Sequence, residues 1–106
     1  MSIGIHLSCP ICGADASGQV GWNLTYNLRP MWREAGLDWD ELEGKPGEDC
    51  LGILTAVVDR LALEPEKFKK LNPPNGWGTY ENLLGTLTEL RDACQQFPNH
   101  TLHTYR

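Results

Sequence analysis

Four cysteines and three histidines are the residues of this sequence best suited to metal or thiol chemistry. Cys9 and Cys12 stand in a tight C-P-I-C-G turn, a spacing that lets the backbone direct two sulfurs at one tetrahedral zinc ion. His100 and His103 would supply the two remaining ligands if the first and last strands pair, with His6 as a further option. Cys9, Cys12, His100 and His103 are therefore the candidate ligands of a zinc site.

Two other interpretations of the cysteine turn stay open. It also fits a reduced structural turn, or a redox pair, although a redox pair normally sits between a strand and a long helix, which this segment lacks. The other two cysteines, Cys50 and Cys94, fall on the apolar faces of expected helices, so we expect them to be buried in the core as small hydrophobic residues.

A second candidate site lies in the segment Gly21-Trp22-Asn23-Leu24-Thr25-Tyr26-Asn27, where amide, hydroxyl and aromatic side chains cluster. Such side chains can cap a helix and satisfy local backbone groups, with Asn27 as the expected cap. They can equally bind a ligand, because amides form hydrogen bonds and aromatic rings stack. On the second interpretation Asn23, Tyr26 and Asn27 belong to a ligand-binding patch.

A third candidate is the loop at residues 72–78 with the residues that follow it. Trp77 lies between two glycines, and Tyr80 follows closely. The indole either plugs the open end of the core or anchors a partner, since Trp and Tyr dominate binding hot spots. We assign Trp77 and Tyr80 to the same ligand-binding patch, and we expect Trp77 and Tyr26 to lie close together.

The acidic run of Asp38, Asp40, Glu41 and Glu43 beside Trp39 could bind a cation or perform acid–base chemistry, but it is more typical of a solvated loop. Nothing in the sequence pairs a nucleophile with a base at a recognisable spacing. We therefore predict that the protein is not an enzyme and has no catalytic residues.

The elements that would position these residues indicate a single α+β domain over residues 1–106, with a small antiparallel sheet from the N- and C-terminal strands packed on about three helices. The expected segments are strands at 3–8, 20–24 and 101–105, helices at 27–35, from Pro46 and from 79 to 97, and a short helical piece at 65–71, with an acidic connector over 37–44.

The chain has 106 residues and a formal net charge of −5. This charge argues against binding nucleic acid through its phosphates and against docking on an anionic membrane. With no recognisable signal peptide, we expect a cytoplasmic protein. Four tryptophans in so short a chain are compatible with surface aromatic residues and hence with a homo-oligomer.

The motifs N-L-T-Y-N at residues 23–27 and N-G-W-G-T-Y at residues 75–80 make the sequence similar to a family of small uncharacterised proteins of bacteriophage and bacterial genomes. The likeness runs from about Trp22 to the last strand. It implies a phage-type protein with an intact domain, and it carries no mechanism.

Together these features predict a non-enzymatic binding protein of phage type, which grips a host protein or a small molecule through its Asn/aromatic patch. The alternative is a structural domain stabilised by zinc at Cys9 and Cys12, in which the metal contributes folding free energy.

Overall fold

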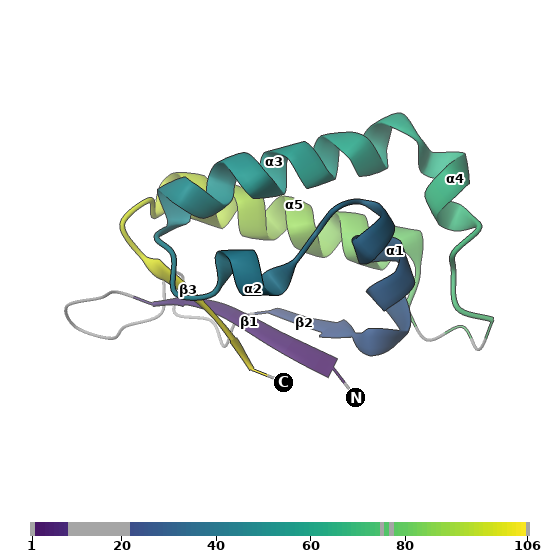
Figure 1. Cartoon of the computed structure of the whole chain (residues 1–106), viewed down its shortest axis with the longest axis horizontal. Coiled ribbons are helices and arrows are strands. Elements are labelled where there is room, and N and C mark those ends of the chain that lie inside the picture. The colour runs from purple at the N-terminus through teal and green to yellow at the C-terminus, as the bar shows by residue number, and fades with distance from the viewer. Residues whose placement is uncertain (1, 9–21, 75, 77, 106) are drawn as a thin grey trace.

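The computed structural model describes residues 2–8, 22–74, 76 and 78–105 (Figure 1). The elements in chain order are β1 (Ser2–Ser8), β2 (Trp22–Thr25), the 3-10 helix η1 (Tyr26–Leu28), α1 (Arg29–Glu34), α2 (Trp39–Leu42), α3 (Gly47–Leu63), α4 (Pro65–Lys69), α5 (Tyr80–Gln96) and β3 (Thr101–Tyr105). None of the helices in these described ranges is both long enough and apolar enough to cross a membrane.

The three strands form an antiparallel sheet in the order β2-β1-β3, so the first and last strands of the chain are neighbours. Side chains alternate across a strand, and Ile3, Ile5 and Leu7 of β1 are all buried on one face. The register pairs Ile3 with Leu24 and Leu7 with Leu102, which places apolar residues of all three strands on that face. The predicted α+β fold with paired terminal strands is confirmed.

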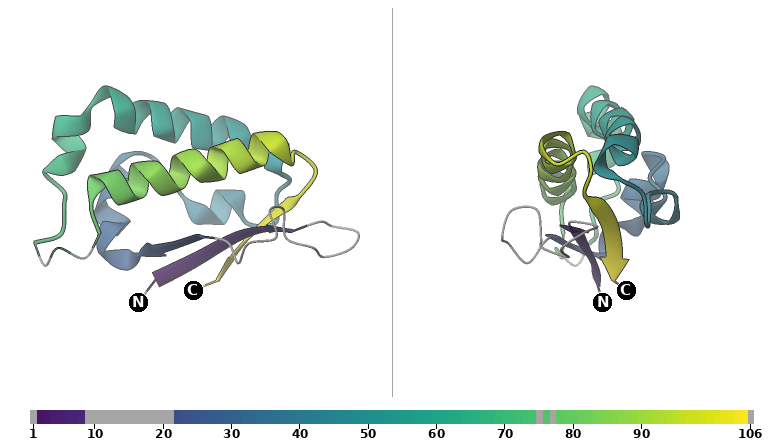
Figure 2. Two further views of the ribbon diagram at one scale, coloured as in Figure 1. Left: turned by 180° about the vertical axis from the view of Figure 1, so that it is seen from behind. Right: turned by 90° about the vertical axis from the view of Figure 1, so that its left-hand side faces the viewer.

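The two long helices, α3 and α5, lie side by side above the sheet, as both views in Figure 2 show. Each carries one apolar stripe at helical spacing. The buried stripe residues are Cys50, Leu54, Val57, Val58 and Leu61 on α3, and Leu83, Leu87, Leu90 and Cys94 on α5. Pro46 directly precedes α3. The expected cap of α5 is present, because the Thr79 side chain accepts a hydrogen bond from the backbone N–H of Asn82 at 3.2 Å.

The entry into α1 differs from the prediction. Asn27 does not cap the helix; instead, the hydroxyl oxygen of Thr25 accepts a hydrogen bond from the backbone N–H of Asn27 at 3.3 Å. The chain first makes the 3-10 turn η1, so the capping side chain lies two residues earlier than expected. Pro30 occupies the first turn of α1, and the helix ends before Gly36, both as predicted.

The acidic connector is also more ordered than expected, since it contains the helix α2. Downstream of α2, the backbone N–H of Gly44 donates to the Leu102 carbonyl at 2.8 Å, and that of Leu102 donates to the Lys45 carbonyl at 2.9 Å. Pro46 forms a β-bridge with Thr101. This segment therefore covers the outer edge of β3, which would otherwise present unpaired backbone groups.

Candidate functional site

The described members of the predicted Asn/aromatic patch differ in their exposure. Asn23 and Asn27 are exposed and Tyr26 is half-buried, whereas Trp77 lies outside the described residues. Tyr80 is only 5% exposed, and its hydroxyl donates to the Leu61 carbonyl at 2.6 Å. The assignment of Tyr80 to a surface patch is therefore corrected: it is a core residue whose polar atom is already used.

The two motif segments nevertheless meet, because the backbone at Gly78 lies against the side chains of Thr25 and Leu28. Gly78 has φ of +95°, and a Cβ at this position would lie 2.7 Å from Cγ2 of Thr25 and 3.0 Å from Cγ of Leu28. The end of the loop before α5 thus packs directly on the junction between β2 and η1. Only glycine fits both the left-handed backbone and this close approach.

Half of the predicted zinc site, Cys9 and Cys12, lies outside the described residues. The two histidines have different neighbours: the ring of His100 is 4.9 Å from that of Phe97, and Nδ1 of His103 is 3.1 Å from Oε2 of Glu43. Among the residues that the structure describes, no three or more His, Cys, Asp or Glu side chains are grouped so as to hold a metal. Zinc binding stays a prediction.

Cys50 and Cys94 are buried in the core between α3 and α5, as predicted. Burial, which disfavours the charged thiolate, raises the pKa of Cys50 to about 11 and that of Cys94 to about 12. Neither thiol is suited to nucleophilic chemistry near neutral pH.

Glu43 joins the connector after α2 to the last strand. Its Oε1 accepts hydrogen bonds from the backbone N–H of Thr104 at 2.9 Å and from the Thr104 hydroxyl at 2.7 Å, while Oε2 faces His103. Partial burial alone would raise the pKa of Glu43, but these hydrogen bonds outweigh it and lower the pKa below its usual value. The carboxylate therefore acts as a clamp on β3.

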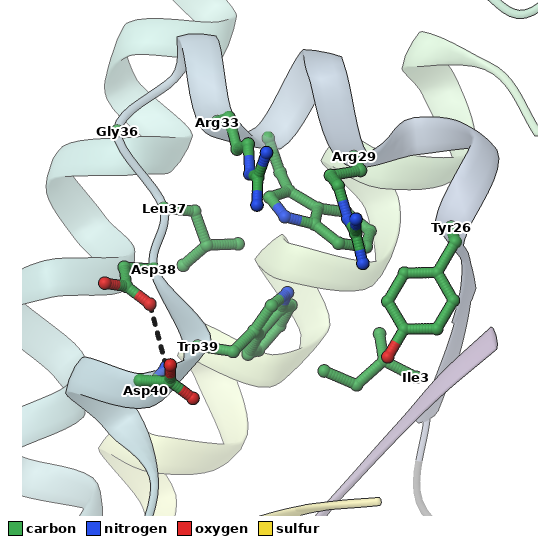
Figure 3. Close-up of a pocket in the computed structure, with 10 residues that line it drawn as sticks. Ile3, Tyr26, Arg29, Arg33, Gly36, Leu37, Asp38, Trp39 and Asp40 are labelled. Atoms are coloured by element: carbon green, nitrogen blue, oxygen red, sulfur yellow. Dashed lines mark hydrogen bonds between the residues drawn. The ribbon is translucent and has the colours of Figure 1, made fainter. Parts of the chain in front are cut away.

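A hollow of about 450 Å³ opens beside α1 and α2, and we call it the α1–α2 pocket (Figure 3). Ile3 of β1 contributes to its wall. The remaining lining comes from the turn and helix that follow β2 and from the connection into α2, namely Tyr26, Arg29, Trp32, Arg33 and residues 36–40. Its volume lies within the range of sites that hold small molecules.

Trp39 is central to this pocket. Its side chain is only 4% exposed, and its ring packs edge-on against Trp32, with centroids 6.1 Å apart and planes at 84°. The indole N–H of Trp39 is buried and has no hydrogen-bond partner within the described ranges. Figure 3 shows its nitrogen turned toward α1, the side of the pocket on which the two arginines lie.

Arg29 and Arg33 are one helical turn apart and extend from α1 toward Trp39 (Figure 3). The Arg29 guanidinium lies over the Tyr26 ring, 4.8 Å from its centroid. Across the described part of the chain, no carboxylate forms an ion pair with either guanidinium. The pocket therefore combines an unsatisfied donor with two cationic donors.

Carboxylates lie at the opposite end of the same pocket. Asp38 begins α2, and its Oδ1 accepts a hydrogen bond from the backbone N–H of Asp40 at 3.0 Å, drawn as the dashed line in Figure 3. Leu37 lies between Asp38 and Arg33 in this view. Part of the acidic run that the sequence predicts as a solvated loop is thus a helix cap at the pocket rim.

A second, shallower hollow of about 320 Å³ lies at the sheet and includes His6, Asn23 and Tyr105. The Tyr105 hydroxyl is 3.3 Å from Nε2 of His6, and the rings of His6 and His103 are 5.5 Å apart. His6 and His103 face each other because they are register partners on β1 and β3. The sequence offered His103 as a zinc ligand and His6 as a further option; in the structure their two rings pack beside one another.

Arg29, Arg33 and Trp39 are the pocket residues that sequence reasoning missed. Two arginines at positions i and i+4 of a short helix, followed by a tryptophan flanked by aspartates, were the available signal. That signal is weak, because nothing in a linear pattern tells whether an indole N–H will find a partner.

Comparison of the chain with protein-family models, with curated proteins and with solved structures returned no match. The similarity to a phage and bacterial family therefore stays a prediction.

Proposed function

We propose that this chain is a non-enzymatic binding protein whose α1–α2 pocket holds a small polar ligand. The observation that carries the proposal is the buried indole N–H of Trp39, which faces the pocket without a partner among the described residues. A buried donor left unsatisfied costs about 1–3 kcal/mol. A ligand that supplies an acceptor oxygen would remove this cost, so the unsatisfied group favours ligand binding.

The shape of the site favours a small molecule over a host protein. The lining is concave, and its indole rings are held rigidly by the core, as in preformed ligand pockets. Tyr26, from the predicted Asn/aromatic patch, lies at this pocket, while Asn23 lies at the hollow on the sheet. We therefore move the proposed site from that patch to the α1–α2 pocket.

The chemistry of the lining supports binding rather than catalysis. Its polar groups are guanidinium and indole donors, the phenol of Tyr26 and the carboxylates of Asp38 and Asp40, of which Asp38 already caps α2. The two described thiols lie in the core and have raised pKa values.

Nuclear magnetic resonance of the indole N–H groups tests the proposal. The four tryptophans should give four indole signals in a ¹H–¹⁵N spectrum, and the variants Trp39→Phe and Trp22→Phe assign two of them. A library of small polar metabolites is then screened. We expect at least one compound to shift the Trp39 signal in a saturable manner.

Trp22 is the internal control, because its indole already donates to Oε2 of Glu89 at 3.2 Å and it does not line the pocket. If every compound that binds shifts the Trp22 signal and leaves the Trp39 signal unchanged, the pocket assignment is wrong.

A further inference from the structure

We infer that the ligand of the α1–α2 pocket carries a single oxyanion group, a carboxylate or a phosphate, held jointly by Arg29, Arg33 and the indole N–H of Trp39. This inference rests on the proposed function and adds the chemical class of the ligand. Its basis is the position of the three donors on one side of the pocket (Figure 3).

Arg29 and Arg33 differ from other cationic side chains of the protein in their interaction partners. Lys67 and Arg91 form ion pairs with carboxylates, and Arg60 donates to a backbone carbonyl. In a chain with a net charge of −5, acidic side chains are plentiful, yet within the described residues none pairs with Arg29 or Arg33. Two guanidinium groups without carboxylate partners beside one buried donor are suited to an external anion.

The spacing of the arginines points the same way. Like charges at i and i+4 on a helix repel each other, which slightly destabilises α1. An oxyanion bound between the two guanidinium groups would attract both of them and so offset their mutual repulsion. Guanidinium forms paired, charge-assisted hydrogen bonds with carboxylate and phosphate oxygens, and the indole N–H would add a further donor to the same group.

The remaining charges in the pocket limit the anion's size and charge. Asp38 lies at the other end of the lining, and a polyphosphate or polycarboxylate extending toward it would meet negative charge. A ligand with one anionic group near α1 avoids this repulsion. The pocket therefore fits a small ligand with one oxyanion group better than a nucleoside triphosphate.

Titration of the full-length chain with sodium acetate and, separately, with inorganic phosphate tests this inference, with sodium chloride at matched ionic strength as the reference. The readout is again the Trp39 indole N–H signal. We expect a saturable shift with acetate, phosphate or both, and none with chloride. A response to acetate alone assigns a carboxylate ligand, and a response to phosphate alone assigns a phosphate ligand.

Charge-removing variants make the test specific. Because charge-assisted contacts are lost, Arg33→Gln and Arg29→Gln should each weaken binding of the responding anion about tenfold or more. Arg91→Gln, which removes an arginine on α5 away from the pocket, should leave binding unchanged. Arg29 and Arg33 are exposed, so the folded state should survive both changes, which dispersed indole signals would verify.

Two results would overturn the inference. The first is the absence of any Trp39 shift with either anion; the second is equal affinity in the wild type and in both glutamine variants. A neutral compound that shifts the Trp39 signal while both anions fail would also overturn it, yet would leave the proposed ligand-binding function standing.

Discussion

Replacing Gly78 with alanine tests whether the two sequence motifs really pack together. The matched control is Gly44→Ala, because Gly44 also has positive φ, +77°, but a Cβ there would have no neighbour within 4 Å. A left-handed backbone costs a non-glycine residue roughly 1–2 kcal/mol, and both variants carry this cost. Only Gly78→Ala adds a clash with Thr25 and Leu28.

Forcing an extra methyl group into a packed site costs about 1–3 kcal/mol beyond the backbone strain. Gly78→Ala should therefore lower the free energy of unfolding by about 2–5 kcal/mol in total, and Gly44→Ala by about 1–2 kcal/mol. Urea denaturation followed by far-ultraviolet circular dichroism measures both, provided that the m value is unchanged.

A second substitution locates the clash. Thr25→Ser removes the methyl group that lies 2.7 Å from the added Cβ and keeps the hydroxyl that caps η1. In the Gly78→Ala background it should restore part of the lost stability, whereas with Gly44→Ala the two effects should simply add. Equal losses for the two glycine variants, or no coupling with Thr25→Ser, would refute the packing described here.

Three further predictions concern residues whose roles the structure assigns. Glu43→Gln should lower the free energy of unfolding at pH 7 by about 1 kcal/mol or less, since the carboxylate is 40% exposed. The folded-state pKa of Glu43 is lowered, so its contribution is present above its unfolded-state pKa and is lost as the pH falls through the folded-state pKa. The difference between wild type and variant should therefore shrink between pH 7 and pH 3 in urea melts, and a constant difference would contradict the clamp. Cys50 and Cys94, with raised pKa values, should resist alkylation by iodoacetamide at pH 8 in the native protein and react in urea, as peptide mass spectrometry can check. Tyr80→Phe should cost about 1 kcal/mol of stability through loss of the hydrogen bond to Leu61, and an unchanged urea midpoint would argue against it.

Most of the fold could be predicted because its signals are local and periodic. The apolar stripes of α3 and α5, Pro46 before one helix and the Thr79 cap of the other follow from helical spacing and from backbone groups that need partners. The last strand was identifiable as a short run after Pro98. The pairing of β3 with β1 could be predicted from one assumption, namely that both strands bury their apolar residues on the same face of one sheet.

The short helices α2 and η1 escaped prediction because tertiary contacts decide them, whereas the short helix α4 was predicted. The helix α2 has four residues, too few for a periodic pattern, and its Trp39 side chain is buried by the core. The choice of Thr25 rather than Asn27 as the capping residue also depends on the 3-10 turn that precedes α1. Propensity alone favours either residue as a cap.

The site was harder to predict than the fold, because it is identified by a buried polar atom that has no hydrogen-bond partner among the described residues. Tyr80 and Trp39 are both buried aromatic residues with one polar atom, and the sequence drew attention only to the first. The Tyr80 hydroxyl reaches a helix carbonyl, while the Trp39 N–H reaches no described acceptor. Whether each of these polar atoms finds a partner depends on elements that are distant in the sequence.

The pairing of β1 with β3 has a consequence for folding during synthesis of the chain. Register partners such as Gly4 and Tyr105 are separated by almost the whole chain, and β3 is synthesised after every other element described here. Translation at about 5–20 residues per second leaves β1 without this neighbour for roughly 5–20 s. During that interval the edge of β1 that pairs with β3 exposes unpaired backbone groups, so this edge is open to non-native strand pairing while the chain is being made.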